Sequence, residues 1–140
     1  MSGRSILVVD DEGPICELLS SILEKAGYQV VCANDGRAAS EAVAQGKFDL
    51  VITDLLMPER DGLELITEVR RRFPGVRIIA MTGGGHIPRE HYLFVAKNLG
   101  AHSLLEKPFD QVRLLAAVKA AFAAPHSSTP REAPGPKSEG

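Results

Sequence analysis

The chain alternates between short runs rich in apolar residues and longer segments whose apolar residues recur every three or four positions. The run Ile6 to Val9 is branched and apolar throughout, which is typical of a strand that is covered on both faces of a parallel sheet. Five such strands separated by helical patterns predict a doubly wound α/β fold, in which right-handed crossovers cover both faces of one parallel sheet. The other four predicted strands are Tyr28 to Ala33, Leu50 to Thr53, Val76 to Met81 and His102 to Glu106.

The first and last helical segments each show one apolar stripe. Pro14 suits the first turn of the first helix, and Gly27 can close that helix. Asp110 has the side chain that commonly caps the start of a helix, so it should begin the last one. Residues spaced by three and four positions should face the sheet. They are Ile15, Leu18, Leu19, Ile22 and Leu23 in the first helix, and Val112, Leu115, Val118 and Phe122 in the last.

Three further helices are expected between these two. The second follows Asp35, and the third begins at Asp61 to Glu64, a segment that resembles a capping box. The third helix should stop at Pro74, because proline cannot continue a helix. A fourth, less regular helix is expected around Glu90 to Asn98.

The composition changes sharply after Ala124. Four prolines follow among serine, threonine, glycine and charged residues. Such a segment can bury too little apolar surface to fold. We therefore expect one globular domain over residues 1–124 and a disordered C-terminal tail over residues 125–140.

The overall composition narrows the possible functions. The chain is 44% hydrophobic and 24% charged, as is ordinary for a soluble globular domain. Its net charge of −2 gives no general reason to expect nucleic acid or an anionic membrane as a partner. Cys16 and Cys32 lack the spacing of a CxxC motif. We expect both cysteines to be packing residues in a reduced, cytoplasmic setting.

Polar residues stand where the predicted strands end. Asp10 and Asp11 follow the first strand, Asp54 the third, Thr82 the fourth and Lys107 the fifth. In doubly wound sheets the functional site lies beside the carboxyl ends of the strands. Three carboxylates at one place repel one another, and a divalent cation removes that repulsion. Oxygen ligands favour magnesium over zinc. The Thr82 hydroxyl and the Lys107 ammonium are suited to bind oxygens of a phosphoryl group.

Four motifs in this order resemble the signature of response-regulator receiver domains. The resemblance covers residues 4 to 123 and implies a flavodoxin-like (βα)5 fold, with five strands and five helices. It also implies a phosphoacceptor of a two-component phosphorelay, which is a switch and not an enzyme beyond self-phosphorylation and autodephosphorylation. The motifs are Ile6 to Glu12, Asp54 to Gly62, Met81 and Thr82, and Lys107 to Phe109.

The resemblance assigns a role to each strand-end residue. Asp54 is implied as the phosphoacceptor, with Thr82 and Lys107 binding phosphoryl oxygens. Asp11, Asp54 and the backbone carbonyl of Leu56 are implied as direct Mg²⁺ ligands, and Asp10 is expected to act mainly through a metal-bound water. By analogy, the peptide bond between Lys107 and Pro108 is expected to be cis, which proline permits at low cost.

This chain departs from the family pattern near the predicted site. Many receivers have an aromatic residue three positions before the lysine, and its ring turns inward on activation; here Leu104 occupies that position. Gly83, Gly84 and Gly85 replace the usual alanine and polar residues after the threonine. The stretch between Thr82 and Lys107 is also a few residues longer than is common. These differences argue for a change carried by the loop and not by a swinging ring.

The resemblance implies partners as well. Phosphoryl groups would come from a sensor histidine kinase or a histidine phosphotransfer protein. A downstream protein would bind the face formed by the fourth helix, fifth strand and fifth helix. We expect no direct contact with nucleic acid or membrane, and a monomer or weak dimer.

Two alternatives stay open. The chain could be a binding module or the receiver piece of a longer regulator with an output domain, although we favour a switch without one. An aspartyl-nucleophile phosphatase is disfavoured. That class usually has a second aspartate two residues after the nucleophile, where Leu56 stands here.

Overall fold

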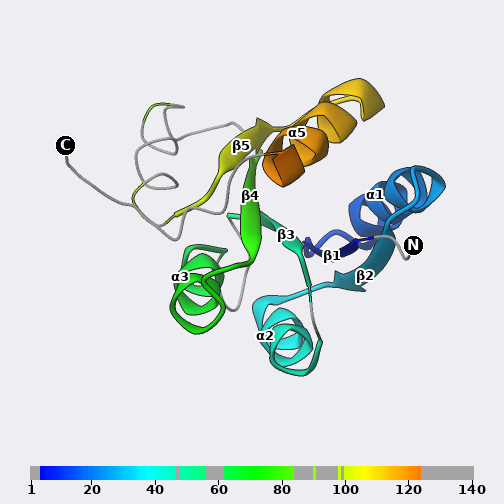
Figure 1. The fold of residues 1–140 in the computed structure, drawn as a ribbon. Helices are drawn as coiled ribbons and strands as arrows, with labels where there is room; N and C mark the ends of the chain where they lie inside the picture. The colour runs from blue at the N-terminus through cyan, green and yellow to red at the C-terminus, as the bar shows by residue number, and fades with distance from the viewer. Residues whose placement is uncertain are drawn as a thin grey trace.

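The computed structural model describes residues 4–46, 48–55, 62–83, 90, 98 and 100–123. Short strands and helices alternate along these residues, as the apolar patterns predict (Figure 1). The observed bounds lie within one or two residues of the predicted ones. The elements are β1 (Ser5–Val9), α1 (Gly13–Lys25), β2 (Gln29–Ala33), α2 (Gly36–Gln45), β3 (Leu50–Asp54), α3 (Gly62–Arg72), β4 (Arg77–Thr82), β5 (Ser103–Glu106) and α5 (Gln111–Ala123).

All five strands pair in parallel, in the order β2-β1-β3-β4-β5. The chain therefore builds the sheet outward in one direction from β1 to β2, and in the other direction from β3 onward. This reversal places the ends of β1 and β3 side by side at the topological switch point, where doubly wound folds bind their ligands. The predicted fold class is confirmed.

The sheet separates two apolar clusters. Leu7 and Val9 point to the face that α2 and α3 cover, whereas Ile6 and Val8 point to the face of α1 and α5. Successive side chains of a strand alternate between faces, so each strand contributes to both clusters. Figure 1 shows the same arrangement, with α1 and α5 on one side of the sheet and α2 and α3 on the other.

The predicted helix ends are observed in α2 and α5. The Asp35 carboxylate accepts a hydrogen bond from the Ala38 amide at 2.7 Å, and the Asp110 carboxylate accepts one from the Arg113 amide at 2.9 Å. Gly27 follows α1 with a φ of 102°, in the left-handed region that glycine adopts without strain. Local sequence therefore determines where α2 and α5 begin and where α1 ends.

The predicted inward faces of α1 and α5 are partly wrong. Leu18 is 56% exposed and Val112 is 74% exposed, although both were expected in the core. In α5 the buried side chains are Leu114, Val118 and Ala121, so the prediction is confirmed for Val118 and wrong for Val112. Both helices carry more apolar residues than one face can bury, so spacing alone does not determine which stripe packs on the sheet.

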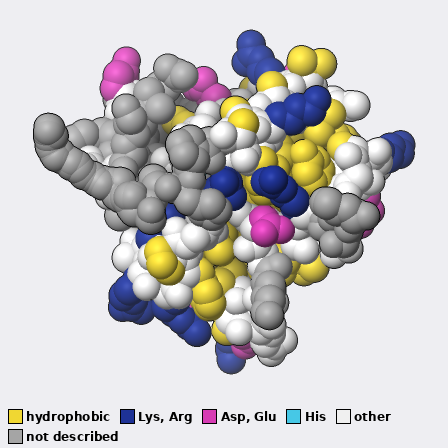
Figure 2. All heavy atoms as spheres, viewed as in Figure 1, with side chains coloured by type: hydrophobic (Ala, Val, Ile, Leu, Met, Phe, Trp, Pro, Cys, Tyr) yellow, Lys and Arg dark blue, Asp and Glu magenta, His cyan; other side chains and the backbone are white. Residues whose placement is uncertain are grey.

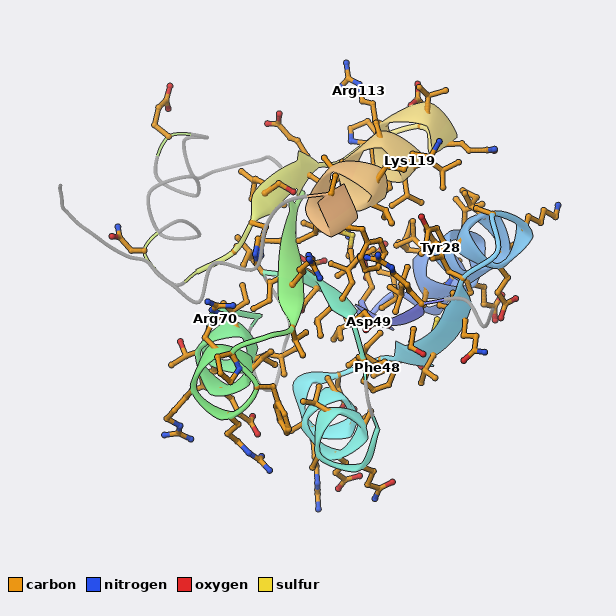
Figure 3. The ribbon with its side chains drawn as sticks, in the orientation of Figure 1. Tyr28, Phe48, Asp49, Arg70, Arg113 and Lys119 are labelled. Carbon is orange, nitrogen blue, oxygen red and sulfur yellow. The ribbon has the colours of Figure 1, made fainter. Side chains whose placement is uncertain are left out.

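The amino ends of the strands lie at the opposite edge of the sheet from the predicted site. Tyr28 and Asp49, labelled in Figure 3, directly precede β2 and β3. The Tyr28 ring stacks on Phe122 at a centroid distance of 5.6 Å, and the Arg4 guanidinium lies 4.4 Å from the centre of the same Phe122 ring. Figure 2, drawn in the same view as Figure 1, shows basic and acidic side chains beside a hydrophobic area near the middle of the visible surface.

Several predictions fall outside the described residues. They concern the Asp61 cap, Leu56, the tail over residues 125–140 and most of the fourth helix, whose label Figure 1 omits. The backbone is helical at Glu90 and at Asn98. Among the residues that the structure describes, no helix is both long enough and apolar enough to cross a bilayer.

Candidate functional site

Asp10 and Asp54 stand side by side because β1 and β3 are neighbours in register. Val9 pairs with Thr53, so the residue after each lies at the same edge of the sheet. The Asp10 amide donates to the Ala33 carbonyl at 3.1 Å, which extends the β1–β2 ladder by one residue. Asp10 is fully buried and Asp54 is 7% exposed. Two carboxylates are thus held in a largely dry environment.

Three carboxylates form a cluster at this edge. One oxygen from each of Asp10, Asp11 and Asp54 lies within 4.8 Å of the other two. Asp10 Oδ1 accepts a hydrogen bond from the Glu12 amide at 2.9 Å, which orients the carboxylate. Asp11 is exposed and is therefore accessible to an ion from solvent. A set of oxygen donors at this spacing fits a hard divalent cation such as Mg²⁺.

The Lys107 ammonium lies between two of these carboxylates. Its Nζ donates to Asp10 Oδ2 at 2.7 Å and to Asp54 Oδ2 at 2.9 Å. Burial alone would lower the pKa of Lys107, but the hydrogen bonds and charges of Asp10 and Asp54 outweigh it, so this pKa lies above its ordinary value. One ammonium therefore offsets part of the repulsion between the two buried acids.

Thr82 ends β4 next to Asp54 and Lys107. Thr82 is only 2% exposed, and its backbone carbonyl accepts a hydrogen bond from the Lys107 amide at 2.7 Å. On the other side, the Leu55 amide donates to the Met81 carbonyl at 3.0 Å, which holds the end of β3 against β4. The Lys107–Pro108 bond is cis, as the resemblance implies. The structure thus brings together Asp10, Asp11, Asp54, Thr82 and Lys107 at one edge of the sheet.

A cleft of about 670 Å³ opens beside the acidic cluster. Asp11, Asp54 and Lys107 are among its polar residues, while Leu18 and Phe109 are among the apolar residues of its wall. The sequence patterns did not identify this apolar wall. One feature of the sequence could have indicated it: α1 has more apolar residues than the sheet can cover, so one of them, Leu18, remains to line the cleft.

Leu104, which stands where many receivers have an aromatic residue, is partly buried. It packs against the apolar cluster on the side of α2 and α3. Its aliphatic side chain therefore fills space in the core, and it has no ring to reorient. The described geometry agrees with the expectation that a ring rotation is not available to this chain.

The fold and the site together define a doubly wound α/β protein with a carboxylate cluster and a lysine at its switch point. The model of one family, the response regulator receiver domain, matches residues 6–119. The chain therefore belongs to the family of response-regulator receiver domains, the regulatory modules of two-component systems.

Solved structures of similar proteins agree with this membership. The chemotaxis response regulator CheY4 of Vibrio cholerae is 30% identical, with a TM-score of 0.79; the match covers 86% of this chain and 99% of that one. A CheY-like receiver domain protein of Methanospirillum hungatei is 29% identical, with a TM-score of 0.78, over 85% of this chain and 93% of the other. The response regulator TrrA of Thermotoga maritima, solved in complex with Mg²⁺ and BeF, is 35% identical, with a TM-score of 0.75, over 84% and 98% of the two chains.

Proposed function

We propose that this protein accepts a phosphoryl group on Asp54 and thereby switches a protein-binding surface. The observation that carries the proposal is the position of Asp54, which is nearly buried, next to Asp10 and Asp11 and in contact with the Lys107 ammonium. A lone surface aspartate would have no means of neutralising the charge that a phosphoryl group brings, about −1.5 to −2 at neutral pH. Here the Lys107 ammonium would neutralise part of that charge, and the neighbouring carboxylates would hold a cation that neutralises more of it.

The residues present fit a bound Mg²⁺. Asp10, Asp11 and Asp54 supply oxygen ligands within 4.8 Å of one another, and the Leu56 carbonyl is proposed as a further ligand outside the described residues. When bound, Mg²⁺ would neutralise charge on the acceptor and on the incoming phosphoryl group. The similar TrrA was solved with Mg²⁺ and BeF, which supports this assignment.

The chain's own residues would carry out the transfer. An Asp54 carboxylate oxygen attacks phosphorus, while the bond from phosphorus to the donor's nitrogen breaks and the donor keeps that electron pair. Lys107 exchanges its Asp54 contact for a phosphoryl oxygen, since an ammonium has three donors and keeps Asp10 as a partner. The buried Thr82 hydroxyl is proposed to donate to a second phosphoryl oxygen.

The proposed donor is a phosphohistidine on a sensor kinase or a histidine phosphotransfer protein in the cytoplasm. The donor must bring phosphorus to Asp54 from the open side, and the 670 Å³ cleft provides that approach. Its apolar wall, which includes the exposed Leu18, suits contact with a protein surface.

The proposed output surface is the face formed by β5, α5 and the segment between β4 and β5. Thr82 ends β4 and Lys107 directly follows β5, and a backbone hydrogen bond of 2.7 Å joins the two residues. A shift of both residues toward a phosphoryl group would move the chain between them. Two new charge-assisted contacts would bias such a two-state segment by a few kcal/mol, on the order needed to invert its populations.

The test is the intact mass after incubation with a small phosphoramidate and Mg²⁺. We expect one added phosphoryl group, none in Asp54→Asn, and none when EDTA removes the metal. Asp49→Asn is the matched control, because it changes a carboxylate at the other end of β3. Normal labelling of Asp54→Asn, or equal labelling in EDTA, would contradict the proposal.

A further inference from the structure

The two cysteines meet where α1 packs on β2. The Cys32 thiol, on β2, donates to the Cys16 carbonyl at 3.1 Å. Cys32 Sγ also lies 2.8 Å from the Ser20 hydroxyl, one turn further along α1. Cys32 is exposed, whereas Cys16 is 1% exposed. The expectation that both cysteines are packing residues therefore holds for Cys16 but is wrong for Cys32.

The Cys16 side chain lies over the same part of the sheet. Its Sγ lies 3.6 Å from the Val8 carbonyl and 3.8 Å from the Ala33 carbonyl. Val8 is the register partner of Cys32, and Ala33 is the next residue of β2. Burial, and then the hydrogen bond and charge of Cys32, raise the pKa of Cys16 to about 12. Both cysteines are free thiols, and both side chains lie at the same contact between α1 and β2.

We propose that Cys16 and Cys32 form a reversible disulfide when the protein meets a peroxide. Cys32 lines a surface pocket of about 430 Å³ together with Ser20, Glu17 and Lys25, so a small oxidant can reach its sulfur. The buried Cys16 is shielded from the oxidant but lies beside Cys32. Cys32 is therefore the thiol that is oxidised first, and Cys16 is the one that completes the bond.

The reaction balances with peroxide as the only co-reactant. Cys32 sulfur attacks one peroxide oxygen and breaks the O–O bond; one water leaves and a sulfenic acid remains on Cys32. Cys16 sulfur then attacks Cys32 sulfur, the S–O bond breaks, and a second water leaves. The protons of both thiols end in the two waters. Two electrons pass from the sulfurs to the peroxide.

This bond would connect α1 to the edge strand β2 close to the phosphoacceptor site. The Ala33 carbonyl, which lies near Cys16 Sγ, also accepts the hydrogen bond from the Asp10 amide. Moving the Cys16 sulfur toward Cys32 would remove its contacts with the Val8 and Ala33 carbonyls. The oxidised form would therefore differ from the reduced form immediately beside Asp10.

Trypsin separates the two cysteines and makes the test direct. Cys16 falls in the peptide from Ser5 to Lys25, and Cys32 in the peptide from Ala26 to Arg37. After dilute hydrogen peroxide and alkylation of the remaining thiols, we expect these two peptides to be linked, with two hydrogens lost from the intact monomer. Dithiothreitol should restore the separate peptides. The link should form many-fold more slowly in urea, where the fold no longer holds the thiols together.

Two variants serve as controls. Cys32→Ser keeps a hydroxyl beside Ser20 and should abolish the link, while Cys16→Ala should leave Cys32 as a sulfenic or more oxidised acid. The inference is overturned if wild-type Cys32 is oxidised while Cys16 stays open to alkylation after unfolding. A disulfide only between two copies of the chain, or equal rates in buffer and urea, would overturn it as well.

Discussion

Replacing Lys107 with methionine removes the ammonium between Asp10 and Asp54 but keeps an unbranched side chain of similar length. In the absence of divalent cations, both carboxylates then lose a hydrogen-bond donor, at 2.7 Å and 2.9 Å respectively. Asp10 has no exposed side-chain surface and Asp54 only 10%. Water can therefore replace little of what the lysine supplied, and the folded state should lose stability.

The contacts give the size of the loss. A hydrogen bond to a charged group contributes about 1.5–3 kcal/mol, and removing one partner of a fully buried ion pair costs about 3–5 kcal/mol. Lys107 keeps 19% of its side-chain surface exposed, so solvent screens part of this interaction. We expect a loss of about 2–3 kcal/mol, below the fully buried value. With a urea dependence of about 1–3 kcal/mol per molar, the midpoint should fall by roughly 0.7–3 M.

The assay is equilibrium urea unfolding at neutral pH in EDTA, repeated with excess Mg²⁺. Mg²⁺ should restore part of the lost stability in Lys107→Met, because a cation at Asp10, Asp11 and Asp54 replaces the missing positive charge. Lys119→Met is the control, since Lys119 lies exposed on α5 and surface substitutions usually change stability by less than about 0.5 kcal/mol. A Lys107→Met protein as stable as wild type in EDTA would refute the electrostatic role given to this lysine.

Three further predictions test other parts of the structure. Asp11→Asn should raise the melting temperature in EDTA by relieving repulsion in the cluster, and should reduce the shift that Mg²⁺ causes; an unchanged Mg²⁺ shift would contradict the metal site. The pKa of Cys16 is about 12 in the folded protein against 9.0 for a free thiol, so above pH 9.0 the unfolded chain releases a proton that the folded chain keeps. Stability should therefore fall as pH rises from 9.0 toward 12, and urea unfolding of Cys16→Ala should show a shallower fall. Leu114→Ala should cost about 2–4 kcal/mol in urea unfolding, whereas Val112→Ala should cost less than about 0.5 kcal/mol, and equal losses would show that α5 is packed differently.

The sheet could be predicted from the sequence because its three central strands, β1, β3 and β4, are buried on both faces. Continuous apolar runs such as Ile6 to Val9 leave little other choice, and the polar residue that ends each run marks the functional edge. Placing Asp10 next to Asp54 needs one further fact, the order of the strands. The general rule for doubly wound sheets supplies where a site lies, and the observed register supplies which residues are adjacent.

The helix faces and the detailed contacts could not be predicted in the same way. In α5 the segment from Leu114 to Val118 is apolar throughout, so two neighbouring stripes compete and only tertiary packing selects Leu114. The double contact of Lys107 with Asp10 and Asp54 depends on side-chain conformation, which strand ends do not specify. The contact between Cys32 and the Cys16 carbonyl depends on how α1 packs on β2, which the spacing of the two residues in the sequence does not specify.

The sheet also separates two hydrophobic cores that pack independently of each other. Neighbouring residues of one strand, such as Leu7 and Val8, belong to different cores, so side chains on opposite faces of the sheet share few packing contacts. Energetic effects of changes at sites without shared partners are close to additive. One pair of helices can therefore accumulate substitutions during evolution while the other pair keeps its packing. The acidic cluster lies at the edge of the sheet itself, so a surface that selects a partner can change while the geometry of the proposed phosphoacceptor site is retained.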